Sequence, residues 1–176
     1  MYNEPGSCPE CGMDLIAAVT VDDEDDTTYL QLKKKFKIAL LFTLPVFILS
    51  MGGMISGNPL SLLIPHHVAD WIQFAFTLPV VFYAAWMFFE RAWISIRTWK
   101  LNMFTLIGLG SGAAFLFSVV ALLFPDIFPE QFKGHNGMVH LYFEATTVIL
   151  TLVLLGQLLE ARAHKQTSGA IKALLK

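Results

Sequence analysis

The stretch "YFEATTVILTLVLLGQLLE", residues 142–160, is an apolar run with a carboxylate near each end. Glu144 and Glu160 lie sixteen residues apart, so a continuous helix would separate them by about 24 Å. That length approaches the thickness of the hydrocarbon core of a bilayer, about 30 Å. The run therefore predicts a membrane-spanning helix over residues 141–160 with an acidic side chain near each membrane surface.

Three further apolar segments are long enough, or nearly so, to cross a bilayer. They cover residues 36–57, 71–89 and 103–124, and the whole chain is 55% hydrophobic. We therefore expect an all-α membrane protein with four transmembrane helices. The net charge of −2 gives no basic excess of the kind that nucleic-acid binding requires, so nucleic acid is not an expected partner.

The positive charges predict how these spans are oriented. Eleven of the twelve Lys and Arg residues lie outside the two loops that follow the first and third spans, and only Lys133 lies within them. By the positive-inside rule both termini face the cytosol. Met103 and Glu160 then lie at the cytosolic surface, and Glu144 lies near the outer surface.

These three side chains have a chemical interpretation and a simpler one. A thioether suits a soft monovalent ion such as Cu⁺ or Ag⁺, and carboxylates in membrane helices usually face a partner or a water-filled path. The simpler interpretation is that Met103 packs in the bundle, Glu160 ends its helix and Glu144 reaches interfacial water.

The cytosolic tail, residues 1–35, carries a cysteine pair in "GSCPECGMDL", residues 6–15. Cys8 and Cys11 form a C-x-x-C knuckle that can aim two thiols at one metal ion. A structural zinc usually takes four ligands, so we favour transient binding of a soft metal. The acidic run 22–26 is interpreted as a solvated linker before a basic membrane anchor.

The segment "FFERAWISIRTWK", residues 88–100, is amphipathic. Its tryptophans and positive charges are typical of a helix lying at the cytosolic membrane interface, as a lipid anchor or as a docking platform. Phe89, Ala92, Trp93, Ile96 and Trp99 share one helical face, and Arg91, Arg97 and Thr98 lie largely opposite.

Taken together, these segments resemble the heavy-metal-transporting P-type ATPases, most closely the bacterial copper exporters. The resemblance rests on "PGSCPECGMDL", on "RTWKLNMFTLIGLGSGAAFLFSVVALLFP" and above all on "YFEATTVILTLVLLGQLLEARAHKQTSGAIKALLK". It covers nearly the whole chain, as a tail followed by the first four transmembrane helices of such a pump.

The resemblance implies roles for single residues. Met103 and Glu160 match the place where the ion enters from the cytosol, and Glu144 matches an acid of the outward release path. The amphipathic segment is similar to the platform on which a copper chaperone or metal-binding domain docks. The residues implied in docking are Arg91, Trp93, Arg97 and Lys100.

The chain departs from the family pattern in three respects. Its tail lacks the earlier half of the family's metal-binding segment, so Cys8 and Cys11 are expected to form an incomplete site. Ala84 and Ala85 stand where the family commonly has a Gly-Gly kink, so the resemblance implies a kink at these two residues. Alanine has little tendency to break a helix, so the sharpness of that bend stays open. The D-K-T-G-T, T-G-E and C-P-C motifs of a complete pump are not in the sequence. We therefore expect the N-terminal membrane portion of an ATPase, with residues 161–176 as a stalk and with ATP and Mg²⁺ bound by other domains.

This interpretation predicts a multi-pass protein of the plasma or inner membrane, in contact with lipid and with the remaining helices of its parent, and unable to hydrolyse ATP alone. Two alternatives stay open. One is a stand-alone, non-enzymatic four-helix membrane protein that binds metal or regulates a pump. The other is a membrane scaffold with a zinc knuckle.

Overall fold

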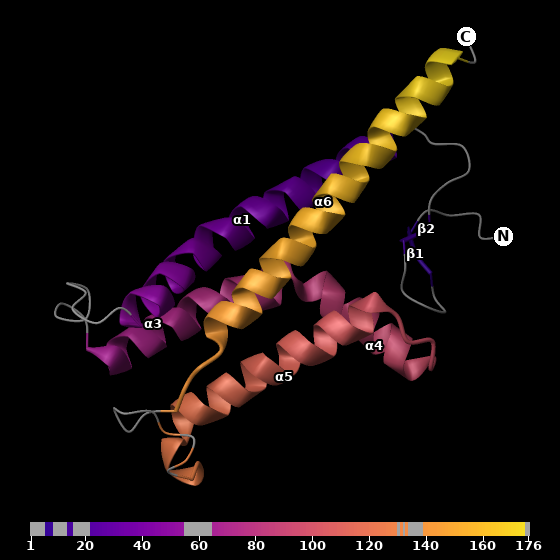
Figure 1. Ribbon diagram of the computed structural model, residues 1–176. Helices are drawn as coiled ribbons and strands as arrows, with labels where there is room; N and C mark the ends of the chain where they lie inside the picture. Colours follow the sequence, from indigo (N-terminus) through magenta and orange to yellow (C-terminus); the bar gives the residue numbers. More distant parts are fainter. Residues whose placement is uncertain are drawn as a thin grey trace.

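The computed structural model describes residues 6–8, 14–15, 22–54, 65–129, 131, 133 and 139–174. Apart from a short β-hairpin and an isolated bridge, the described secondary structure is helical, as expected (Figure 1). The elements are β1 (Gly6–Ser7), β2 (Asp14–Leu15), α1 (Asp22–Met54), α3 (His66–Pro79), η1 (Val80–Ala84), α4 (Trp86–Arg97), α5 (Met103–Leu123), η2 (Pro125–Ile127) and α6 (Phe143–Leu174).

Three helical stretches are long and apolar enough to cross a membrane, namely Thr27–Gly52, Met103–Leu123 and Phe143–His164. The stretch His67–Ala84 passes the same test only together with Trp86–Arg97, from which it is bent by 61°. Three candidate spans thus agree with the expectation. The second expected span, residues 71–89, is broken near its end, where π-helical η1 passes into α4.

The first long helix differs from the expectation at its start. The acidic residues 22–26 begin α1 and do not form a separate linker. α1 continues through Pro45 to Met54, and the end of the expected first span, residues 55–57, lies outside the described residues.

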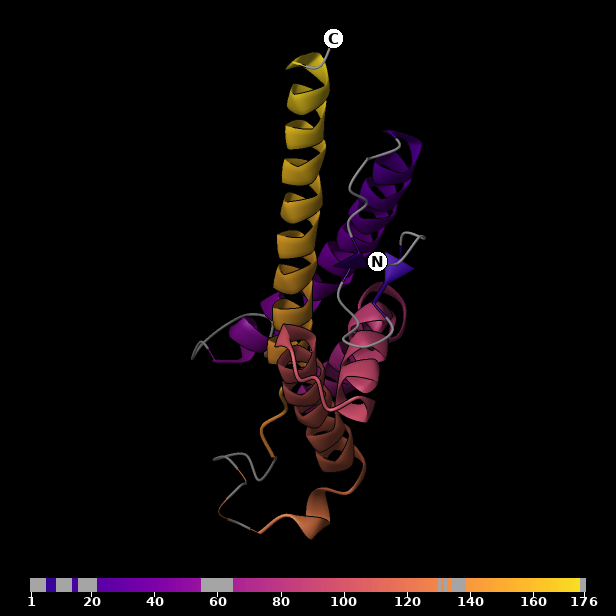
Figure 2. The same cartoon turned by 90° about the vertical axis from the view of Figure 1, so that its right-hand side faces the viewer.

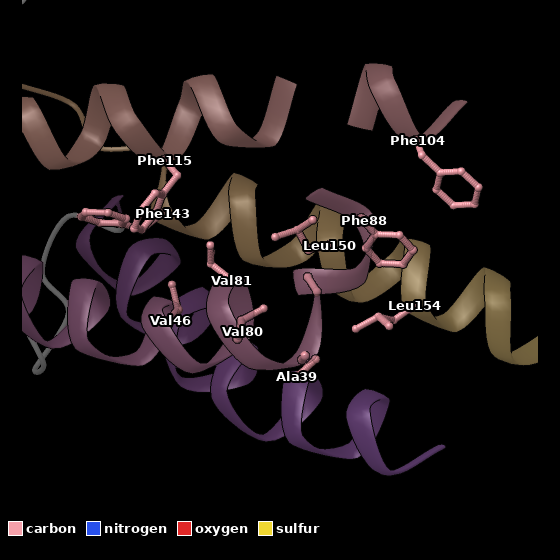
Figure 3. Packing of buried hydrophobic residues seen from close by; sticks show 12 residues of the cluster. Ala39, Val46, Val80, Val81, Phe88, Phe104, Phe115, Phe143, Leu150 and Leu154 are labelled. Atoms are coloured by element: carbon pink, nitrogen blue, oxygen red, sulfur yellow. The ribbon is translucent and has the colours of Figure 1, made fainter. Parts of the chain in front are cut away.

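The long helices pack into one bundle. α1, α3 and α6 lie together, and α5 runs antiparallel to α6 in both views (Figures 1 and 2). A buried apolar cluster joins them, with side chains contributed by α1, η1, α4, α5 and α6 (Figure 3). Its labelled members are Ala39, Val46, Val80, Val81, Phe88, Phe104, Phe115, Phe143, Leu150 and Leu154.

A hydrogen bond fixes how α1 and α6 lie against each other. The Thr43 and Thr151 hydroxyl oxygens are 2.8 Å apart, and the Thr43 hydroxyl also donates to the Thr147 carbonyl at 3.5 Å. Both threonine side chains are buried. Because lipid tails are as apolar as leucine, such polar contacts and close packing are what hold membrane helices together.

The contact between α4 and α5 is a close one. The rings of Phe88 and Phe104 are stacked with their centroids 5.9 Å apart. A Cβ atom added to Gly108 would come within 2.6 Å of the Cβ atom of Ala92. Only a glycine at position 108 allows the two helices to approach this closely. The packing of α4 against α5 therefore depends on the pairing of Ala92 with Gly108.

Candidate metal-transport site

Met103 is the first residue of α5. The preceding residue, Asn102, caps the helix: its side-chain oxygen accepts from the backbone N–H of Thr105 at 3.2 Å, and the Thr105 hydroxyl accepts from the Asn102 N–H at 3.3 Å. This reciprocal cap fixes where the helix begins. The Met103 side chain is 59% exposed, so its thioether lies on the surface of the bundle and does not fill its core.

Glu160 also lies on the surface of the bundle, on α6. The side-chain amide of Gln157 donates to its Oε2 atom at 3.0 Å, one turn away on the same helix. Because α5 and α6 are antiparallel (Figures 1 and 2), the first turn of α5 and the C-terminal half of α6 face the same end of the bundle. Both candidate ligands are therefore exposed residues on helix segments that lie toward the same end of the bundle.

Glu144 lies at the opposite end of the same span, in the first turn of α6, and is partly buried. The turn before it is tied to α5, because the backbone N–H of Tyr142 donates to the Ser118 hydroxyl at 2.8 Å. Ser118 is fully buried and donates in turn to the Ala114 carbonyl at 2.8 Å. The position of Glu144 thus depends on α5, which no pattern along the chain indicated.

Of the residues implied in docking on and after α4, some are exposed and one is buried. Trp93 is 69% exposed, and Arg97 and Lys100 are exposed as well. Arg91 is only 8% exposed, and its guanidinium carbon lies 4.9 Å from the centre of the Phe104 ring, in cation–π geometry. Of the residues that the resemblance implies in docking, Arg91 is thus covered by a neighbouring helix.

The reason is that the buried face of α4 comprises Phe88, Arg91, Ala92 and Ser95. Their helical spacing places these four residues on one side of α4. Because α5 packs against that side, it covers Arg91 together with Ala92. The sequence shows the amphipathicity of α4 but not which arc of the helix its neighbour covers.

The bend before α4 occurs at the two alanines. The π-helical turn η1 ends at Ala84, and the backbone N–H of Ala85 donates to the Val80 carbonyl at 2.9 Å. Pro79 precedes this turn and lacks the N–H that a continuous α-helix needs. Proline and π-turns are recognised causes of kinks, and both alanine side chains are fully buried, where larger ones would not fit.

Of the two cysteines in the N-terminal tail, only Cys8 lies within the described residues. β1 and β2 pair antiparallel with Gly6 opposite Leu15 and Ser7 opposite Asp14. Cys8 therefore follows directly after the paired residues, in the segment that joins the two strands. Cys11 falls in the same connecting segment but lies outside the described residues.

Sequence comparison identifies the tail first. Residues 2–18, which include both cysteines, match the family model described as "Heavy metal binding domain".

The rest of the chain is covered by curated relatives. It is 49% identical to a copper-exporting P-type ATPase of Legionella pneumophila over 98% of this chain, and 45% identical to a silver-exporting P-type ATPase of Salmonella typhimurium over 97%. A copper-transporting P-type ATPase of Rhizobium leguminosarum is 43% identical over 98%. The chain spans 21–23% of the length of these relatives. The chain is therefore homologous, over nearly its whole length, to the copper- and silver-transporting P-type ATPases, as the sequence motifs indicated.

Proposed function

We propose that this chain is the N-terminal membrane portion of an ATP-driven Cu⁺ exporter, with Ag⁺ as a second possible substrate. The homology over nearly the whole chain carries the proposal. ATP and Mg²⁺ act in other domains of the parent protein, and this segment alone does not hydrolyse ATP. The bent pair of α3 with η1 and α4 supplies the fourth membrane crossing and the interfacial helix.

The orientation follows from the positive charges. Eleven of the twelve Lys and Arg residues lie outside the two loops that follow the first and third spans, so the opposite side of the membrane from these loops is cytosolic under the positive-inside rule. Both termini then face the cytosol, and the protein is a multi-pass protein of the plasma or inner membrane. A bend of 61° from a roughly upright span also lays α4 near the plane of the membrane surface.

In this arrangement Cu⁺ enters at Met103 and Glu160. The exposed thioether supplies a soft donor, which suits a monovalent copper ion, and the carboxylate supplies a charge that stabilises the arriving cation. A copper chaperone or metal-binding domain docks on the exposed part of α4, at Trp93 and Arg97, and on Lys100 in the loop that follows. The ion leaves past Glu144, at the other end of α6.

The test is copper-stimulated ATP hydrolysis by the complete parent ATPase in vesicles, measured over a range of buffered Cu⁺ concentrations. Met103→Ala and Glu160→Gln are expected to raise the Cu⁺ concentration for half-maximal turnover by at least about 10-fold, because even loss of a group that only orients a metal ligand typically has an effect of that size. Met51→Ala is the matched control, since Met51 is also a surface methionine but lies near the far end of α1.

Glu144→Gln is expected to act differently, because it lies on the release side. It should lower turnover at saturating copper while leaving the half-maximal concentration nearly unchanged. If Met103→Ala and Glu160→Gln both retain the wild-type copper dependence, the proposed place of ion uptake is wrong.

A further inference from the structure

The corner between α4 and α5 carries a buried chain of hydroxyl hydrogen bonds. The Thr105 hydroxyl donates to the Ser95 hydroxyl at 2.7 Å, and the Ser95 hydroxyl donates to the Lys100 carbonyl. Ser95 is fully buried and Thr105 is nearly so. One residue from the last turn of α4 and one from the first turn of α5 are thus joined directly, and the loop between them is attached to the same group.

The backbone of this corner forms a Schellman motif. The N–H of Lys100 donates to the Ser95 carbonyl at 3.1 Å, and the N–H of Trp99 donates to the Ile96 carbonyl at 3.2 Å. These are the two hydrogen bonds that define the motif, and the residue between the helix end and the loop then takes a left-handed conformation. Trp99 takes it here, with φ of 54°.

A tryptophan at this position is strained. Glycine normally occupies it, because left-handed backbone angles bring a Cβ atom too close to the following carbonyl oxygen. Such strain persists only where the surrounding structure holds it in place. Ser95 does so twice, because its carbonyl accepts from the Lys100 N–H and its hydroxyl donates to the Lys100 carbonyl.

Met103 begins α5 two residues before Thr105, so the same corner determines where its thioether lies. Thr105 and Gly108 face α4, whereas Met103 and Leu106 are exposed on the part of α5 that α4 does not cover. If the corner relaxed, α5 could shift or rotate on α4, and Met103 would move relative to the interfacial helix.

We propose that Ser95 and Thr105 are positioning residues that hold Met103 at a fixed place beside α4, so that a metal ion delivered at α4 reaches the thioether. This inference rests on the proposed function and names residues that neither touch the metal nor lie on the surface. The hydrogen bonds that join Ser95 to Thr105 and to Lys100, which we call the clamp, also hold the strained Trp99 in place.

The experiment measures Cu⁺-stimulated ATP hydrolysis by the complete parent ATPase in vesicles, at limiting and at saturating buffered Cu⁺. Ser95→Ala and Thr105→Val are expected to raise the half-maximal Cu⁺ concentration about five-fold, the factor that corresponds to one lost hydrogen bond. Turnover at saturating Cu⁺ should change little. Thr105→Ser keeps the hydroxyl and should behave as wild type.

Two further variants separate positioning from general loss of structure. Ser111→Ala removes another buried hydroxyl of α5, whose bond at 2.6 Å goes to the Ile107 carbonyl of its own helix; it should leave the copper dependence unchanged. Trp99→Gly removes the backbone strain, so combining it with Ser95→Ala should return the half-maximal Cu⁺ concentration toward the wild-type value.

The outcomes separate the two proposals. If Met103→Ala raises the half-maximal Cu⁺ concentration while Ser95→Ala and Thr105→Val do not, Met103 takes up the metal but the clamp does not position it. If the clamp variants act only on turnover at saturating Cu⁺, or Trp99→Gly fails to rescue Ser95→Ala, the positioning role is wrong. If Met103→Ala itself has no effect, Met103 does not take up the metal, and the positioning role is wrong as well.

Discussion

The close approach of α4 and α5 at Gly108 gives the sharpest prediction. A Cβ atom on Gly108 would lie 2.6 Å from the Cβ atom of Ala92, whereas ordinary contacts begin at 3.4 Å. The next neighbour of that atom is the backbone oxygen of Phe88 at 3.7 Å. Neither the Ala92 methyl group nor the Phe88 backbone can rotate away, so Gly108→Ala must push the two helices apart by close to 1 Å.

The cost can be separated from the effect of alanine on the helix itself. Overpacking typically costs about 1–3 kcal/mol, while replacing glycine by alanine inside a helix favours the helix by up to about 1 kcal/mol. Gly110→Ala is the matched control, because it adds the same methyl group to the same helix with nothing within 4 Å. The difference between the stability changes of the two variants therefore reports only the steric contact with Ala92. Gly108→Ala should be less stable than Gly110→Ala by about 1–3 kcal/mol.

The assay is thermal unfolding of the purified chain in detergent micelles. A difference of that size should lower the Tm of Gly108→Ala by about 2–12 °C relative to Gly110→Ala. Adding Ala92→Gly removes the opposing methyl group, so the double variant should recover the coupling part of the loss. If Gly108→Ala and Gly110→Ala unfold together, the close seating of α4 on α5 is refuted.

Three other predictions concern separate parts of the chain. Thr43→Val and Thr151→Val should each destabilise the α1–α6 contact by about 0.6–1 kcal/mol and should not add in the double variant, since either one removes the same hydrogen bond; a double-mutant cycle in detergent checks this. Replacing Cys8 and Cys11 by serine should abolish tight Cu⁺ binding by the tail, measured by competition with a chromophoric Cu⁺ chelator, whereas a clear preference for Zn²⁺ over Cu⁺ in the unchanged tail would favour the zinc-knuckle alternative. A green fluorescent protein fused after Lys176 should fluoresce and an alkaline phosphatase fused there should be inactive, because the terminus is expected in the cytosol; the reverse pattern would contradict the orientation.

The bend at Ala85 shows how far the sequence alone could go. The resemblance implied a kink at Ala84 and Ala85, but alanine breaks a helix less readily than glycine, so the sharpness of the bend stayed open. The structure bends there by 61° because of Pro79 and the π-helical turn after it. Pro79 was visible in the sequence and is the signal that could have located the break.

Arg91 shows a second kind of limit. Helical spacing predicts which residues share a face, and α4 is indeed a helix over most of the expected amphipathic segment. Spacing cannot say which face a neighbour covers, because that depends on the close approach that Gly108 allows. As a result Arg91 lies over the Phe104 ring, while Trp93 and Arg97 remain on the surface.

The sequence by itself determined the helical class, three membrane-length helices and the kinship with metal-transporting ATPases. Those features follow from local composition: runs of apolar residues satisfy the backbone internally and match the bilayer thickness. Tertiary structure alone decided the buried bonds between Ser95 and Thr105 and between Ser118 and the Tyr142 backbone, since each joins groups on two different elements. Hydroxyl groups carry no periodic signal, and their partners exist only once the helices have packed.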